Sequence, residues 1–256
     1  MTMLLKFIVC LFAGIGAGLG TGFAGMSAAA VISPMLIAFL HMPAYEVVGI
    51  ALASDVLASA ASAYIYGKNK NIDVKNGIAM MLSVLCFTLV GSYVASLVPN
   101  QTMGNFSVVM TLFLGIKFIV KPVMTTKEKM EQVEPRKRLL QSIVCGIVVG
   151  FICGFVGAGG GMMMLLILTT VLGYELKTAV GTSVFIMAFT AFTGSVSHIV
   201  IGGMPDIACL VFCIVFTLLW ARVAAIFANK ASAITLNRAT GVVLVVLSAV
   251  ILLVGR

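Results

Sequence analysis

The stretch GFVGAGGGMMMLLILTTVL, residues 154–172, places a run of glycines directly before a short apolar segment. A related pattern, Gly22-Phe23-Ala24-Gly25, precedes the apolar segment 25–40 in the first part of the chain. An α-helix rises about 1.5 Å per residue, so a segment of about 15 residues cannot cross a hydrocarbon core of about 30 Å. Both patterns therefore predict a short or broken helix that begins inside a membrane.

The composition of the whole chain points to the same environment. Of 256 residues, 61% are apolar, and the charged ones number only 16 Lys and Arg and 8 Asp and Glu, which excludes an ordinary soluble protein. We expect an all-α polytopic membrane protein with about ten transmembrane segments. Residues 1–120 form a first five-segment repeat, 121–138 a charged cytoplasmic linker, and 139–256 a second repeat. The apolar segments lie at 3–21, 25–40, 46–66, 76–97 and 104–120, and at 139–156, 159–172, 178–201, 207–228 and 235–255.

The two halves also share a series of residues in the same order. Each half has a Tyr-Glu pair, a serine inside its third segment and an aspartate where that segment ends. These residues are Tyr45-Glu46, Ser54 and Asp73 in the first half, and Tyr174-Glu175, Ser183 and Asp206 in the second. Because five is odd, two such halves have opposite orientations if every segment crosses the membrane.

The positions of the basic residues favour inverted halves. The loop after the third segment carries three lysines (68–75) in the first half but only Asp206 in the second, and the loop after the fourth segment reverses this pattern. Ten crossings with the linker inside leave only Lys6 and Arg256 outside, as the positive-inside rule favours. Eight crossings with re-entrant short segments would instead place outside Lys177, Arg222, Lys230 and Arg238. The net charge of +8 thus reflects topology and does not predict nucleic acid binding.

Two interpretations fit the glycine-rich stretches. Glycines let transmembrane helices approach closely. They also leave free N–H groups at the start of a helix, where an anion binds without Arg or Lys. Neither stretch has the Lys-Ser/Thr of a phosphate-binding P-loop, which argues against a nucleotide. The residues that would surround an anion are Gly25, Ser27, Gly157, Gly159, Gly160 and Gly161.

Polar side chains inside the third segment of each half are further candidates. Ser54, Thr182 and Ser183 either bond to their own helix backbone or donate to the oxygens of a substrate. Asp55 is the one carboxylate well inside a predicted span, and Val184 takes its place in the second half. An ionised group near the bilayer centre costs free energy, so we expect Asp55 to couple transport to protons or a cation; the alternative is a structural bond to a neighbouring helix.

Enzymatic and metal chemistry find little support. His198 and Ser183 suggest a serine hydrolase, but fifteen residues of one helix separate them by roughly 22 Å. His198 is retained as a gating or substrate-contact candidate. We expect no cofactor and no metal, because no zinc-binding motif is present and the six cysteines lie in apolar segments, where they serve packing.

At this point the chain resembles the sulfite exporter family TauE/SafE. The resemblance rests on residues 154–161, on Ala179-Val180-Gly181-Thr182-Ser183 and on Gly202-Gly203 before Asp206, with a weaker first copy at 22–34 and Ser54. The first copy departs from the pattern at Ala28-Ala29 and Ala53. The resemblance implies a polytopic plasma-membrane carrier of sulfur-containing anions such as sulfite, sulfoacetate or other organosulfonates, commonly in export.

From the residues and the resemblance together we expect a secondary transporter of small sulfur-containing anions. The anion would lie at the short-helix N-termini between the repeats, and transport would be proton-coupled. A passive anion channel is the alternative, and an intramembrane enzyme a distant one. Expected partners are the anion, the lipid bilayer and a proton, and a homo-oligomer is left open. The expected location is the plasma membrane of a bacterium.

Overall fold

The computed structural model describes residues 2–95, 112–113, 115–131, 134–156 and 160–254. These residues are helical almost throughout, and no strand occurs among them. The helices of the first half are α1 (Met3–Ala24), α2 (Ala29–Leu40), α3 (Ala44–Lys68) and α4 (Val74–Ala95). The linker and second half contain α6 (Lys127–Glu131), α7 (Pro135–Val156), α8 (Gly160–Thr170), α9 (Leu176–Gly202), α10 (Ile207–Lys230) and α11 (Ala233–Val254). The all-α prediction is confirmed.

Five of these helices are long and apolar enough to cross a membrane. They are Met3–Ala24, Tyr45–Lys68, Leu176–Val200, Ile207–Lys230 and Ala233–Val250. The helices of the molecule have apolar outward surfaces: Leu4, Leu89, Val200 and Leu253 are each more than two-thirds exposed. An apolar surface of this extent is expected where lipid, not water, surrounds a protein.

The two segments predicted to be too short to cross are indeed short. α2 has 12 residues and α8 has 11, which correspond to about 16 to 18 Å of helix. The chain turns into α2 through Gly25, whose positive φ of 59° suits glycine. The Gly25 N–H donates to the Thr21 carbonyl, as in an αL cap, and the Met26 N–H donates to the Gly20 carbonyl. α1 therefore ends, and α2 begins, within the apolar part of the chain.

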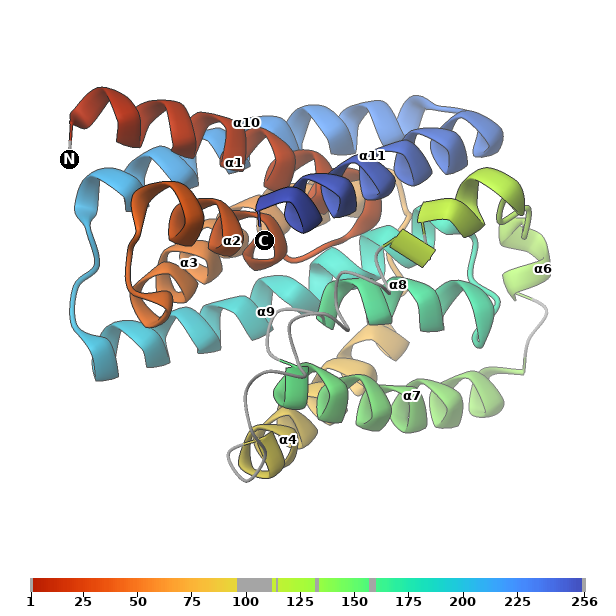
Figure 1. Cartoon of the computed structure of the whole chain (residues 1–256). Coiled ribbons are helices and arrows are strands. Elements are labelled where there is room, and N and C mark those ends of the chain that lie inside the picture. Colours follow the sequence, from red (N-terminus) through yellow and green to blue (C-terminus); the bar gives the residue numbers. More distant parts are fainter. Residues whose placement is uncertain (1, 96–111, 114, 132–133, 157–159, 255–256) are drawn as a thin grey trace.

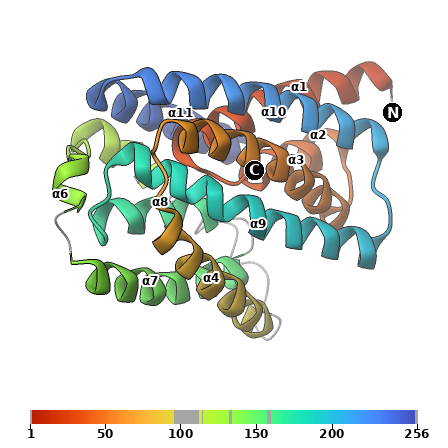
Figure 2. The same ribbon diagram turned by 180° about the vertical axis from the view of Figure 1, so that it is seen from behind.

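The helices lie in three groups (Figure 1). α1, α10 and α11 lie along one side, α4 and α7 lie together on the opposite side, and α2, α3, α8 and α9 fill the space between them, an arrangement also visible from behind (Figure 2). The most extensive helix contacts join α4 to α7, α1 to α10, and α3 to α9. Each of these pairs joins one helix of the first half to one of the second.

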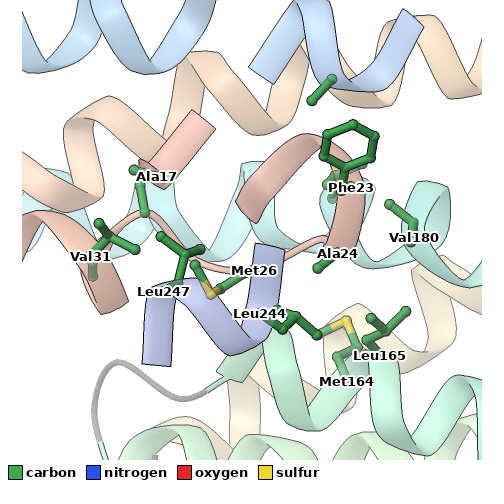
Figure 3. Close-up of a cluster of buried hydrophobic side chains, with 14 of the residues drawn as sticks. Ala17, Phe23, Ala24, Met26, Val31, Met164, Leu165, Val180, Leu244 and Leu247 are labelled. Carbon is green, nitrogen blue, oxygen red and sulfur yellow. The ribbon is translucent and has the colours of Figure 1, made fainter. Parts of the chain in front are cut away.

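The buried core lies around the turn between α1 and α2 (Figure 3). Phe23 and Met26 from this turn belong to one buried cluster with side chains of four other helices. Those partners are Val31 of α2, Met164 and Leu165 of α8, Val180 of α9, and Leu244 and Leu247 of α11. The core thus holds the turn in a fixed position between the two halves.

Candidate functional site

The end of α1 is held by polar side chains from three other helices. The last carbonyls of a helix have no partner in that helix, and inside a membrane water does not supply one. Tyr66 of α3 donates to the Gly22 carbonyl (2.9 Å) and Thr240 of α11 to that of Phe23 (3.1 Å). Ser183 of α9 donates to the carbonyl of Gly25 (3.1 Å). These bonds supply partners for the carbonyls at the break between α1 and α2.

The side chain of Asp55, in α3, lies beside the N-terminus of α2. Its side chain is 1% exposed, and the Ser59 hydroxyl donates to its Oδ1 at 3.0 Å. The Ser27 hydroxyl and the Ala28 N–H also lie against the carboxylate. Neither ion pair found among the described residues includes Asp55. The carboxylate is therefore compensated by hydroxyls and by the positive end of the α2 dipole.

The beginning of α8 meets the same turn. A Cβ at Gly161 would lie 2.5 Å from the Gly25 carbonyl oxygen and 2.9 Å from the Ser27 nitrogen, so only glycine fits there. Gly160 is the first residue of α8. The N-termini of α2 and α8 consequently lie close together at this turn, and Asp55 lies beside the partially positive end of α2.

The remaining predicted site residues are distributed unevenly. Gly157 and Gly159 lie outside the described residues. Ser54 donates to the Ile50 carbonyl of its own helix (2.8 Å), and Thr182 accepts from the Asp73 N–H at the end of the α3–α4 connection (3.1 Å). The structure thus brings together Gly25, Ser27, Asp55, Gly161 and Ser183, whereas Ser54 and Thr182 are engaged in bonds of their own.

His198 lies away from this turn, at the end of the molecule where α3 begins. Its ring is 4.4 Å from the ring of Tyr45, and its Nδ1 is 3.2 Å from the Tyr45 carbonyl oxygen. Both residues line a cavity of about 290 Å³ that also includes Glu46 and Gly49. His198 can therefore affect access to the protein at this end but does not touch the residues around Asp55. Among the described residues, no group of three His, Cys, Asp or Glu side chains is placed to hold a metal.

Sequence analysis did not find two ion pairs that lie at opposite ends of α3. Lys6 of α1 pairs with Asp206, whose N–H donates to Glu46 at the start of α3. Arg138 of α7 lies 3.8 Å from Asp73, which follows the end of α3. The shared aspartates Asp73 and Asp206 were the available signal, but their partners are too distant in sequence to be recognised.

The two aspartates lie outside the candidate spans, and the groups around them alter proton affinities there. Partial burial opposes ionisation of Asp206, but the bonds from Lys6 and from the Cys209 N–H outweigh it and hold the pKa of Asp206 below its usual value. Burial, together with the adjacent Asp73 carboxylate, raises the pKa of Tyr174 above its usual value. The Tyr174 hydroxyl therefore remains protonated and donates to Asp73 Oδ2 at 2.9 Å.

Comparison with known proteins identifies the family. The family model for the sulfite exporter TauE/SafE matches residues 10–251, which is nearly the whole chain. The chain belongs to the TauE/SafE family. This TauE/SafE protein is 26% identical over 218 residues to the probable membrane transporter protein YunE of Bacillus subtilis, covering 77% of this chain and 80% of that one.

Two further relatives have similar descriptions. The probable membrane transporter protein YdhB of Bacillus subtilis is 25% identical over 213 residues, 83% of this chain and 86% of the relative. The probable membrane transporter protein MJ0441 of Methanocaldococcus jannaschii is 26% identical over 157 residues, 59% and 55% of the two chains. No solved structure is significantly similar to this chain. The TauE/SafE resemblance is confirmed, and together with the five candidate spans it makes this a multi-pass membrane protein.

Proposed function

We propose that this TauE/SafE protein is a secondary transporter of small sulfur-containing anions, such as sulfite, sulfoacetate or other organosulfonates. The observation that carries the proposal is the meeting of the α2 and α8 N-termini at Gly25, Ser27 and Gly161, with Asp55 beside them. The N–H groups at helix ends, such as the Ala28 N–H that now bonds to Asp55, can bind an oxyanion without a buried cation. The family description, sulfite exporter, supports this substrate class and the export direction. The names of the relatives support membrane transport only.

The architecture would be that of two inverted halves, and matched helix packing supports it. On α1, Gly14 and Gly18 lie against Phe216, Thr217 and Trp220 of α10. On α7, Gly146 and Gly150 lie against Ser83, Val84 and Phe87 of α4. The two glycine pairs have the same separation, and so do the two sets of partners. Two halves that pack by the same contacts are suited to alternating access around a site between them.

Asp55 would couple the anion to a proton. An ionised Asp55 occupies the positive end of α2 and repels an anion, whereas a protonated Asp55 leaves that helix end free and can donate a hydrogen bond. Proton and anion would therefore bind together, which is the linkage that a symporter requires. Ser27 and Ser183 would add hydroxyl donors once their present bonds are exchanged for bonds to the substrate.

The proposal is tested by counterflow into proteoliposomes. Vesicles loaded with unlabelled sulfite or sulfoacetate should take up external label faster than empty vesicles if the protein is a carrier. A passive channel, the alternative, gives no such trans-stimulation. Loss of trans-stimulation with retained flux would replace the carrier by the channel, and absence of flux for every sulfur anion tried would exclude the substrate class.

The same vesicles test the coupling role of Asp55. An Asp55→Asn variant keeps the shape of the side chain but cannot titrate. It should still exchange substrate, should lose the pH dependence of binding, and should no longer accumulate substrate when only a pH gradient is applied. Glu46→Gln, which removes a carboxylate at the start of the same helix, is the matched control and should accumulate substrate normally. Wild-type accumulation by Asp55→Asn would make Asp55 structural.

A further inference from the structure

A groove between α3 and α10 lies apart from the proposed anion site. It has a volume of about 610 Å³ and is lined by residues of the last two turns of α3 and of the second half of α10. Asp55, Ser27 and Gly161 do not line it. The groove therefore needs an explanation separate from transport.

The mouth of the groove is basic. Lys68 is the last residue of α3, Lys230 is the last of α10, and Arg222 stands about 12 Å before Lys230 along the same helix. None of the described residues that line the groove is an Asp or a Glu. In the described part of the chain these three cations take part in no ion pair. The groove therefore presents three uncompensated positive charges.

The walls of the groove are apolar and open to the surroundings. Tyr64, Leu219 and Ile226 line it and are 73%, 53% and 40% exposed. All three lie in candidate membrane spans: Tyr64 and Ile226 near the ends at which Lys68 and Lys230 terminate their helices, and Leu219 at the middle of its span. An apolar wall that leads to a basic mouth at a membrane surface matches a lipid chain and its phosphate group.

We propose that this groove binds an anionic phospholipid, with its phosphate at Lys68, Arg222 and Lys230 and one acyl chain along Tyr64, Leu219 and Ile226. A free oxyanion would use the cations but gain nothing from the apolar walls. A zwitterionic lipid would use the walls but would bring its own positive charge to the mouth. Only an anionic lipid is complementary to both parts, and it would bind even if the protein carried no substrate.

Binding is measured by titrating the full-length protein, in phosphatidylcholine nanodiscs, with fluorescent phosphatidylglycerol. Removing all three charges in Lys68→Gln, Arg222→Gln, Lys230→Gln should weaken binding about a hundredfold, and each single change about fivefold. The matched control Lys75→Gln, Arg136→Gln, Lys137→Gln removes three exposed charges outside the groove and should change binding less than threefold. The single changes keep the test decisive if the triple variant does not fold.

A second variant tests the apolar wall. Ala61→Phe fills the groove without changing its charge and should weaken phosphatidylglycerol binding about tenfold. The proposal is overturned if the control variant loses as much affinity as the groove variant, because binding then follows surface charge alone. It is equally overturned if glycerol 3-phosphate competes as well as unlabelled phosphatidylglycerol, because the site then takes a free anion, or if fluorescent phosphatidylcholine binds as tightly as fluorescent phosphatidylglycerol.

Discussion

An ion pair between a basic residue and an aspartate lies near each end of α3, and the two pairs differ in their bonding. At one end Lys6 of α1 meets Asp206 before α10, and at the other Arg138 of α7 meets Asp73 before α4. Both aspartates also cap the helix that follows them: Oδ1 of Asp206 accepts from the Cys209 N–H (2.9 Å), and Oδ1 of Asp73 from that of Asn76 (3.2 Å). The offset in sequence from Lys6 to Arg138 is nearly the same as the offset from Asp73 to Asp206, as in a duplicated chain.

The pairs differ in how completely they are bonded. Lys6 and Asp206 are 19% and 28% exposed and make a direct hydrogen bond. Arg138 and Asp73 are 12% and 13% exposed, and the buried Nε and Nη2 of Arg138 have no hydrogen-bond partner among the described residues. A buried donor without a partner loses its hydration and gains nothing in return. The Arg138–Asp73 pair therefore carries a greater free-energy cost than the Lys6–Asp206 pair.

The α1/α10 and α4/α7 helix pairs also differ in how extensively they pack against the rest of the protein. The α1/α10 pair also packs along α3, whereas the α4/α7 pair has much smaller contacts with α9 and α8 and lies apart in both views (Figures 1 and 2). A pair with fewer outside contacts moves as a unit at lower cost. If the protein alternates its access, we expect the Arg138 end to open more readily.

The largest expected effect concerns the sides on which the two ends lie. Lys75 follows α3 and Met204 follows α9, which are the third segments of the two halves, and both residues are exposed. If the halves are inverted, Lys75→Cys and Met204→Cys, each in a cysteine-free protein, should lie on opposite sides of the membrane. An impermeant maleimide applied to intact cells should label the cysteine at 204 and leave that at 75 unlabelled until the cells are opened. Labelling of both from outside would remove the inverted arrangement.

Sequence reasoning reached the features that depend on local composition. The glycines before 25–40 and 159–172 bound the short helices, and the position of Asp55 in an apolar segment is enough to place it inside a span. The contacts of Asp55 with Ser27 and Ala28 were out of reach, because hydropathy gives depth in a membrane but not the direction in which a side chain points. The same applies to Lys6 and Asp206, which only the fold brings together.

The glycines also illustrate a choice that sequence alone left open. Gly14 and Gly18 serve close packing of α1 on α10. At Gly161 both interpretations remain compatible, since it packs on the turn at Gly25 and also lies in the first turn of α8. A sequence shows that the backbone can approach something, while the structure is needed to identify the neighbour.

The next largest effect compares the glycine contacts of the two helix pairs. A Cβ at Gly18 would lie 2.6 Å from the Thr217 carbonyl oxygen, and one at Gly150 would lie 2.5 Å from that of Val84. Gly18→Val should lower the free energy of unfolding by about 3 kcal/mol, because α10 is also held by α3 and cannot retreat. Gly150→Val should cost about 1 to 2 kcal/mol, since α4 and α7 can separate toward the lipid.

Thermal unfolding of the purified variants in detergent measures this difference. Gly67→Ala is the control, because a Cβ there would meet only Ile72 Cδ1 at an ordinary 3.5 Å. It should unfold within a degree or two of wild type. Equal losses for Gly18→Val and Gly150→Val would mean that both helix pairs are fixed equally firmly.

The smallest effect compares the aspartates of the two ion pairs. Asp73→Ala leaves Arg138 buried with no acidic partner, and we expect it to lower the free energy of unfolding by about 2 kcal/mol. This is less than the 3 to 5 kcal/mol typical of a broken buried pair, because the pair is already long at 3.8 Å. Asp206→Ala removes a helix cap and a partly exposed ion pair, and should cost about 1 kcal/mol.

A second change at each end separates burial from capping. Adding Arg138→Met to Asp73→Ala removes the unpaired guanidinium and should restore about half of the lost stability, whereas adding Lys6→Met to Asp206→Ala should restore none. Because the folded-state pKa of Asp206 lies below its usual value, its contribution is complete above about pH 5 and is lost as the pH falls through that lowered pKa. Unfolding curves at pH 7 and at pH 3 should therefore differ less between Asp206→Ala and wild type at the lower pH. If Asp206→Ala lowers the free energy of unfolding more than Asp73→Ala at pH 7, the Lys6–Asp206 pair stabilises the protein more than the Arg138–Asp73 pair does. The unpaired buried donors of Arg138 then cost little free energy.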